Sequence, residues 1–162
     1  MARLERARKF WMVVFGLIAV GSLTAAVAVA NPGNAFFHPQ SLVTGTQTDE
    51  IRLNSDRVKL QTKGPADVRV QLITFDAGGA SGWHHHPGFV IATVKTGTVT
   101  FTRDCKSTDY GPGSVFVESG DTPGQASSTN GATLYATFVA PHVDATAGGP
   151  VFRIEDDPPS CP

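Results

Sequence analysis

The chain has 162 residues, and its 13 Lys and Arg residues nearly balance its 14 Asp and Glu residues. The balance is uneven along the chain, because residues 31–162 hold nine basic and thirteen acidic residues, a net charge of −4. No basic patch remains outside the N-terminus, so the composition argues against nucleic acid as a partner. The 132 residues that follow residue 30 are enough for one domain with its own core.

The N-terminal segment has a basic cluster followed by a long apolar run. No charged residue occurs between Phe10 and Ala30, and the run ends in Ala28-Val29-Ala30. This pattern predicts either a secretory signal peptide cut before Asn31 or an uncleaved transmembrane anchor helix over residues 1–30, because about 20 apolar residues also span a bilayer core. Both alternatives give an extracytoplasmic protein of the cell envelope, secreted or membrane-anchored, with the membrane as a partner only if the segment is uncleaved.

Residues 31–48 contain Pro, Gly, Asn and Gln with little periodicity, and we predict a linker there with at most one helical turn or short strand. The longest alternation of apolar and polar residues runs from Asp67 to Phe75 and predicts a half-buried strand. Eight to ten short strands separated by Gly and Pro turns, with almost no helical pattern, predict a single β-barrel or jelly-roll domain over residues 49–162. Apart from that strand, the clearest runs are 58–61, 89–95, 98–103, 115–117, 132–140 and 151–154.

Cys105 and Cys161 are the only two cysteines. An even number of cysteines in an exported chain favours a disulfide, because the compartment is oxidising. Both lie in polar, turn-like surroundings, which argues against the alternative of two unrelated buried thiols. The predicted disulfide ties the C-terminal tail to the middle of the domain. The acidic run at residues 155–157 in that tail is expected to be solvated.

Three of the five histidines are consecutive, directly after a glycine-rich turn and before an apolar run. Alternate side chains of a strand face the same way, so His84 and His86 are expected to project together and His85 to the other side. Two imidazoles on one face can supply two nitrogen ligands to a transition metal. Two alternatives remain: a metal-free pocket in which the pair binds a polar or anionic ligand, and a turn without a ligand.

The residues around the histidines resemble the first motif of the cupin family. That motif reads Gly, five residues, His-x-His, three or four residues, Glu, six residues, Gly, and it is matched by Gly78, by His84 and His86, and by Gly97. Residues 111–131 resemble the second cupin motif in outline. The resemblance implies a mainly β, RmlC-like jelly-roll barrel that holds a metal through two histidines, a Glu and a motif-two His. It also implies that a homodimer is a common assembly.

Two of the four family ligands are missing from this chain. The Glu position falls on Val90, which cannot bind a metal, and no histidine occurs at residues 123–125, where the motif-two His is expected. Gln125 is the best polar substitute there. His84 and His86 therefore carry over as the metal ligands that the resemblance implies. The residues that could complete the set in space are Glu118, Gln125, Asp121, His85 and His142.

Trp83 stands beside the histidines and is expected to line a ligand pocket with Gln125, or simply to pack one end of the barrel. Because two family ligands are missing, we predict an extracytoplasmic cupin-domain protein that binds a metal ion or a small ligand in its barrel. The cofactor would be one divalent transition metal, with Fe, Mn, Zn and Ni not distinguished. The alternative is a metal-dependent cupin enzyme of oxygenase or isomerase type.

Overall fold

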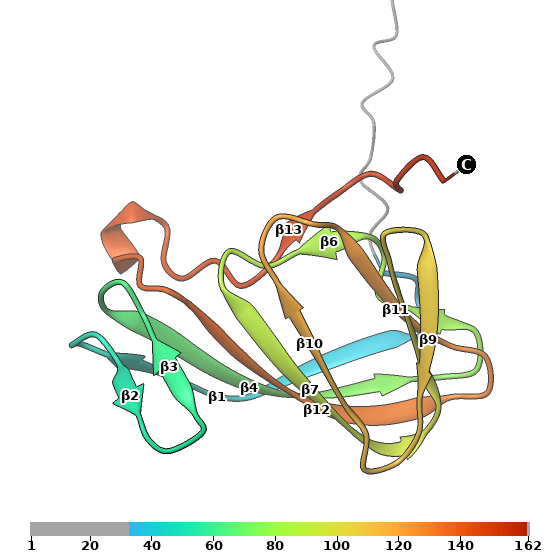
Figure 1. Ribbon diagram of the computed structural model, residues 1–162. Coiled ribbons are helices and arrows are strands. Elements are labelled where there is room, and N and C mark those ends of the chain that lie inside the picture. Colours follow the sequence, from blue (N-terminus) through green and yellow to red (C-terminus); the bar gives the residue numbers. More distant parts are fainter. Residues whose placement is uncertain (1–32, 162) are drawn as a thin grey trace, which may run out of the picture.

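The computed structural model describes residues 33–161 (Figure 1). The segment for which the sequence predicts a signal peptide or an anchor helix lies outside these residues. Among residues 33–161, no helix combines the length and the hydropathy needed to cross a membrane. This part of the chain is mainly β, as predicted, and its one helical turn is the 3-10 helix η1 (Ala145–Ala147).

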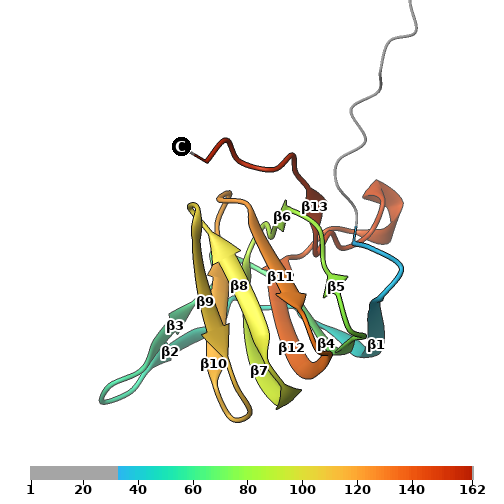
Figure 2. The same cartoon turned by 90° about the vertical axis from the view of Figure 1, so that its right-hand side faces the viewer.

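Two sheets and one separate hairpin make up the fold (Figures 1 and 2). The first sheet has the order β1-β4-β12-β7-β10, with β1 at Phe37–Gln47, β4 at Ala66–Phe75, β12 at Ala132–Pro141, β7 at Phe89–Gly97 and β10 at Val115–Ser119. The second has the order β13-β6-β11-β8-β9, with β13 at Ile154–Glu155, β6 at His84–His85, β11 at Gly124–Ser128, β8 at Val99–Arg103 and β9 at Lys106–Tyr110; β5 at Gly79–Ala80 also pairs with β11. The hairpin joins β2 (Arg52–Asn54) to β3 (Lys59–Gln61) and extends away from both sheets.

The core lies between the two sheets and follows the two-residue period of the strands. On β12 every second residue from Ala132 to Ala140 is buried, and β7 buries Val90, Ala92 and Val94 in the same way. The second sheet contributes Phe101, whose ring stacks on Phe116 of the first sheet at 4.9 Å between centroids. Every strand pair in the described chain is antiparallel, as in a jelly roll, but the strands form separate sheets rather than one hydrogen-bonded closed barrel.

Strand β4 turns the more polar of its two faces toward the interior. The alternation predicted for residues 67–75 is confirmed, but Val68 and Val70 lie on the outer face of the sheet. The residues of β4 that face inward and line a cavity between the sheets are Arg69, Gln71, Ile73 and Phe75. The first two bring a guanidinium and an amide into the interior.

The prediction of a linker over residues 31–48 is wrong, because Phe37–Gln47 forms β1 and pairs with β4 from end to end. β1 is an edge strand with mostly exposed side chains, so its sequence shows no alternation of burial. Backbone hydrogen bonds to β4 hold it in place, interrupted by one register shift between Ser41 and Val43. Only Phe37 and Pro39 of β1 reach the cavity between the sheets.

The predicted disulfide between Cys105 and Cys161 is confirmed. Cys105 belongs to the two-residue turn that joins β8 to β9, and both Asp104 and Cys105 have positive φ angles, 50° and 59°. Such angles are typical of the turns that match the twist of a β-hairpin. The strand β9 that follows was not predicted, because its residues are polar and almost all exposed.

The C-terminal segment, residues 150–161, lies beside β6 (Figure 1). Of the residues 151–154 predicted as a strand, only Ile154 is in one. It forms β13 together with Glu155, and β13 pairs with β6. The expectation that the acidic run is solvated is wrong for Asp156. Its carboxylate lies 2.8 Å from Nδ1 of His85, and its backbone N–H donates to the carbonyl oxygen of Trp83 at 3.0 Å. The disulfide, the short pairing and these contacts fix the segment against the domain.

We expect the double substitution Cys105→Ser and Cys161→Ser to lower the free energy of unfolding by about 4 kcal/mol. The two cysteines are 56 residues apart, and a cross-link over such a loop restricts the unfolded chain by roughly that amount. Urea unfolding of the variant and of the oxidised wild type measures the difference. The reduced wild type is the control and should match the variant. Equal stability of the oxidised wild type and the variant would contradict the prediction.

Candidate metal centre

The two histidines singled out in the sequence share one face, as predicted. His84 is 5 % exposed and His86 is 4 % exposed, and their rings meet edge to face at 4.8 Å between centroids. His85 points the other way, toward Asp156 of the C-terminal segment. Strand β6 and the residue that follows it therefore place two imidazoles in the interior, those of His84 and His86.

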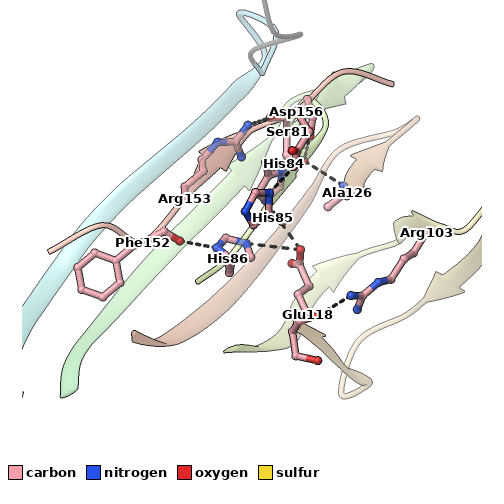
Figure 3. A network of polar contacts seen from close by, with 12 residues as sticks. Ser81, His84, His85, His86, Arg103, Glu118, Ala126, Phe152, Arg153 and Asp156 are labelled. Atoms are coloured by element: carbon pink, nitrogen blue, oxygen red, sulfur yellow. Dashed lines mark hydrogen bonds and ion pairs between the residues drawn. The ribbon is translucent and has the colours of Figure 1, made fainter. Parts of the chain in front are cut away.

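Glu118 is the third member of the group. It comes from β10, where alternation turns Phe116 and Glu118 inward and leaves the residues on either side of each exposed. Its Oε2 lies 3.8 Å from Nε2 of His84 and 3.5 Å from Nε2 of His86. Figure 3 shows this carboxylate approaching the two rings from the opposite strand. The ligand atoms of these three residues all lie within 4.8 Å of one another. No other group of three or more His, Cys, Asp or Glu side chains in the described chain is arranged in this way.

The register of the first sheet explains why Glu118 is in this place. On β7, Val90 occupies the position at which the cupin motif has its Glu, and the residue paired with Val90 on β10 is Glu118. Side chains of directly paired residues leave the sheet about 5 Å apart and on the same face. The carboxylate is thus supplied by the neighbouring strand, opposite the position where the motif predicts it.

The outer nitrogens of both rings are bonded to carbonyl oxygens. Nδ1 of His84 lies 2.9 Å from the carbonyl oxygen of Gly82, and Nδ1 of His86 contacts the carbonyl oxygen of Phe152. A carbonyl oxygen can only accept, so each Nδ1 carries the proton and donates it. In a neutral ring, Nε2 then presents a lone pair toward Glu118. This is the arrangement by which proteins orient histidines that bind metals.

Burial lowers the pKa of His84 to about 4, and the positive charge of Arg153 acts in the same direction. At neutral pH this ring is therefore uncharged, and its lone pair faces a carboxylate oxygen. Lone pairs and a carboxylate that converge in a buried place repel one another unless a proton or a metal ion lies between them. Two atoms bound to one transition metal at about 2.1 Å can be at most about 4.2 Å apart, so separations of 3.5 and 3.8 Å suit a shared ion.

A cavity of about 170 Å³ opens next to this group, between the two sheets. His84, His86 and Glu118 form one part of its wall, and most of the remainder is apolar. A metal held by three protein ligands would therefore face a space that can admit a small molecule. The aromatic part of the wall consists of Phe37, Phe75, Phe116, Phe138 and Phe152.

A second set of polar contacts holds β6 and the C-terminal segment together (Figure 3). The guanidinium of Arg153 donates to the carbonyl oxygen of Ser81 at 2.6 Å and forms an ion pair with Glu155. The hydroxyl of Ser81 accepts a hydrogen bond from the N–H of Ala126 on β11 at 3.0 Å. The segment that carries His84 and His86 is thus tied to β11 on one side and to the C-terminal segment on the other.

The other residues predicted for the site do not join it. Neither Trp83 nor Gln125 is among the residues that line the cavity. On β11 the alternation turns Ala126 toward the cavity, so that Gln125 faces away from it. His142 pairs instead with Asp67 at 3.0 Å. One feature of the sequence does indicate Glu118. It is the only acidic residue in an apolar strand, and it lies two positions after Phe116, so both side chains are expected on the same buried face.

No protein-family model and no curated protein matches the chain. Solved structures similar to it include a cupin superfamily protein from Desulfitobacterium hafniense, 14% identical over 63% of this chain and 82% of that chain with a TM-score of 0.44. They also include an RmlC-like cupin from Shewanella frigidimarina, 22% identical over 46% of this chain and 67% of that chain with a TM-score of 0.43. A third is the salicylate 1,2-dioxygenase of Pseudoaminobacter salicylatoxidans, 17% identical over 43% of this chain with a TM-score of 0.42, of which this chain spans 19%. The similar structures thus include cupins, as the motif in the sequence predicts.

In the metal-free protein we expect His84 to stay neutral, with its proton on Nδ1, until the pH falls to about 4. The reason is that burial penalises the charged imidazolium. Two-dimensional ¹H–¹⁵N NMR of the ring nitrogens, recorded from pH 8 to well below pH 4, reports both the tautomer and the protonation midpoint. A midpoint at the ordinary value of 6.5, or a proton on Nε2 at neutral pH, would contradict this assignment.

Proposed function

We propose that the protein is a cupin-type domain that binds one divalent transition metal through His84, His86 and Glu118 and works outside the cytoplasm. The observation that carries the proposal is the convergence of two imidazole Nε2 atoms and one carboxylate oxygen, all buried, beside a cavity. Imidazole and carboxylate ligands suit Fe, Mn, Zn and Ni alike, so the donor set does not select among these metals.

The proposed location rests on the N-terminal sequence and on the disulfide. A basic cluster followed by the apolar run from Phe10 to Ala30 is typical of an export signal or an anchor. The bond between Cys105 and Cys161 is compatible with an oxidising compartment, where disulfides form and persist. Membrane attachment through an uncleaved segment and assembly as a homodimer stay predictions.

The second candidate function is that of a metal-dependent oxygenase. It is favoured by the ligand set itself, since two histidines and one carboxylate are the ligands of non-haem Fe(II) oxygenases. Iron held in this way keeps open positions at which dioxygen and a substrate can bind and react. The protein's own contribution would be to orient both imidazoles through Gly82 and Phe152 and to exclude bulk water with the aromatic wall.

Metal binding is tested on the full-length chain, purified without a polyhistidine tag, by elemental analysis and by titration calorimetry. We expect one metal ion per chain. Glu118→Gln should lower the affinity by at least about 100-fold, because loss of the partners that merely orient metal ligands already costs 10- to 100-fold. The double variant Val90→Glu and Glu118→Val returns the carboxylate to the position that the motif predicts and should recover part of the affinity.

The matched controls are His38→Ala and His142→Ala, which remove histidines that lie outside the metal group. They should bind metal as tightly as the wild type. If the wild type binds no metal, or if Glu118→Gln binds it as tightly as the wild type, the proposed metal centre is wrong.

The oxygenase candidate requires an open position on iron. The Fe(II)-loaded protein should therefore bind nitric oxide, a stable substitute for dioxygen, and give the electron paramagnetic resonance signal of a high-spin iron–nitrosyl. The metal-free protein treated in the same way is the control. An iron-loaded protein without this signal would count against the oxygenase and leave a metal-binding domain.

A further inference from the structure

The cavity contains an arginine whose charge is not balanced. Three residues with permanently or normally charged side chains, Arg69, Arg153 and Glu118, line it. Glu118 belongs to the metal group, and Arg153 forms an ion pair with Glu155. No carboxylate in the described chain forms an ion pair with Arg69. Because Glu118 lies at the metal group, Arg69 can pair with an anion in its own part of the cavity with or without a metal. A divalent ion at the metal group would make the cavity as a whole positive and strengthen that preference.

Arg69 is held in place without using its terminal nitrogens. Its Nε donates to the hydroxyl of Thr44 on β1 at 3.1 Å, and its guanidinium lies over the ring of Phe152 at 4.0 Å from the centroid. The stacking and the single hydrogen bond fix the plane of the group. The two terminal nitrogens make no hydrogen bond within the described chain, and they remain available for the two-point contact that an arginine makes with a carboxylate.

An apolar path connects Arg69 to the metal group. Phe152, under the guanidinium, packs edge to face on Phe138 at 6.1 Å between centroids, and Phe138 in turn packs on His86 at 5.3 Å. A ligand that reaches from Arg69 toward the histidines would thus lie along aromatic rings. The cavity volume of about 170 Å³ limits that ligand to a small molecule.

We propose that the cavity binds a small organic carboxylate with an apolar body, whose carboxylate pairs with Arg69 and whose other end faces the metal group. Only the second contact rests on the proposed function. The contact with Arg69 exists with or without a metal. An inorganic anion shares the charge of such a ligand but has no apolar body to pack against the aromatic wall formed by Phe138 and Phe152.

The test uses benzoate and pentanoate as probes, with benzamide and pentanamide as neutral molecules of the same shape. Binding to the full-length protein is measured by calorimetry and by NMR chemical-shift changes, once with metal and once with EDTA. We expect each carboxylate to bind at least about 10-fold more tightly than its amide, because a charge-assisted pair is worth more than a neutral hydrogen bond. Inorganic phosphate should bind more weakly than either carboxylate.

Arg69→Gln should lower the affinity for both carboxylates by about 10-fold or more and leave the amides unaffected. Arg69→Lys keeps the charge but loses the planar two-point contact, and it should fall between Arg69→Gln and the wild type. Arg57→Gln is the matched control, since this arginine is almost fully exposed and pairs with Asp56 on the β2–β3 hairpin. It should bind like the wild type.

Three results would overturn the proposal: carboxylates that bind no better than amides, affinity unchanged in Arg69→Gln, or phosphate that binds as well as the carboxylates. The first and third need no variant, so a misfolded Arg69→Gln protein does not prevent a decision. The two proposals also fail separately. Carboxylate binding in EDTA by a protein that takes up no metal would refute the metal centre alone. Metal binding without carboxylate binding would refute this inference alone.

Discussion

The candidate site depends on the convergence of two imidazoles and one carboxylate in a buried place. His84 lies on β6 of the second sheet, His86 directly follows that strand, and Glu118 lies on β10 of the first sheet. Their ring nitrogens and carboxylate point at one another. Each imidazole is oriented by a carbonyl oxygen behind it, so neither can turn its lone pair away. Such an arrangement is costly unless a proton or a metal ion lies between the donors. The buried group is thus suited to hold a cation.

The C-terminal segment is part of this site rather than a tail. It provides the carbonyl oxygen of Phe152 that orients His86, and the ring of the same residue supports Arg69. Asp156 and the disulfide at Cys161 hold the segment against β6 and the β8–β9 turn. A bond that closes a long loop thus helps to hold both the orientation of the His86 ring and the position of the Arg69 side chain in the cavity.

The position of Glu118 shows how a carboxylate can reach the same place in space from a neighbouring strand. Val90 and Glu118 are paired across β7 and β10, and both face the interior. Exchange of the acidic residue between two such positions moves the carboxylate by only about 5 Å. A motif that counts residues along one strand cannot detect the exchange, because the distance between the two positions along the chain is long while the distance in space is short.

The β class, the disulfide and the shared face of His84 and His86 could be predicted from the sequence, because each follows from local alternation, from spacing or from the number of cysteines. The edge strand β1 could not, because its side chains are mostly exposed and backbone pairing holds it. The residues that complete the site depend on contacts between distant parts of the chain. Glu118, Arg69 and Phe152 reach the cavity from three different strands and segments, and strand register and the closure of the C-terminal segment bring them together.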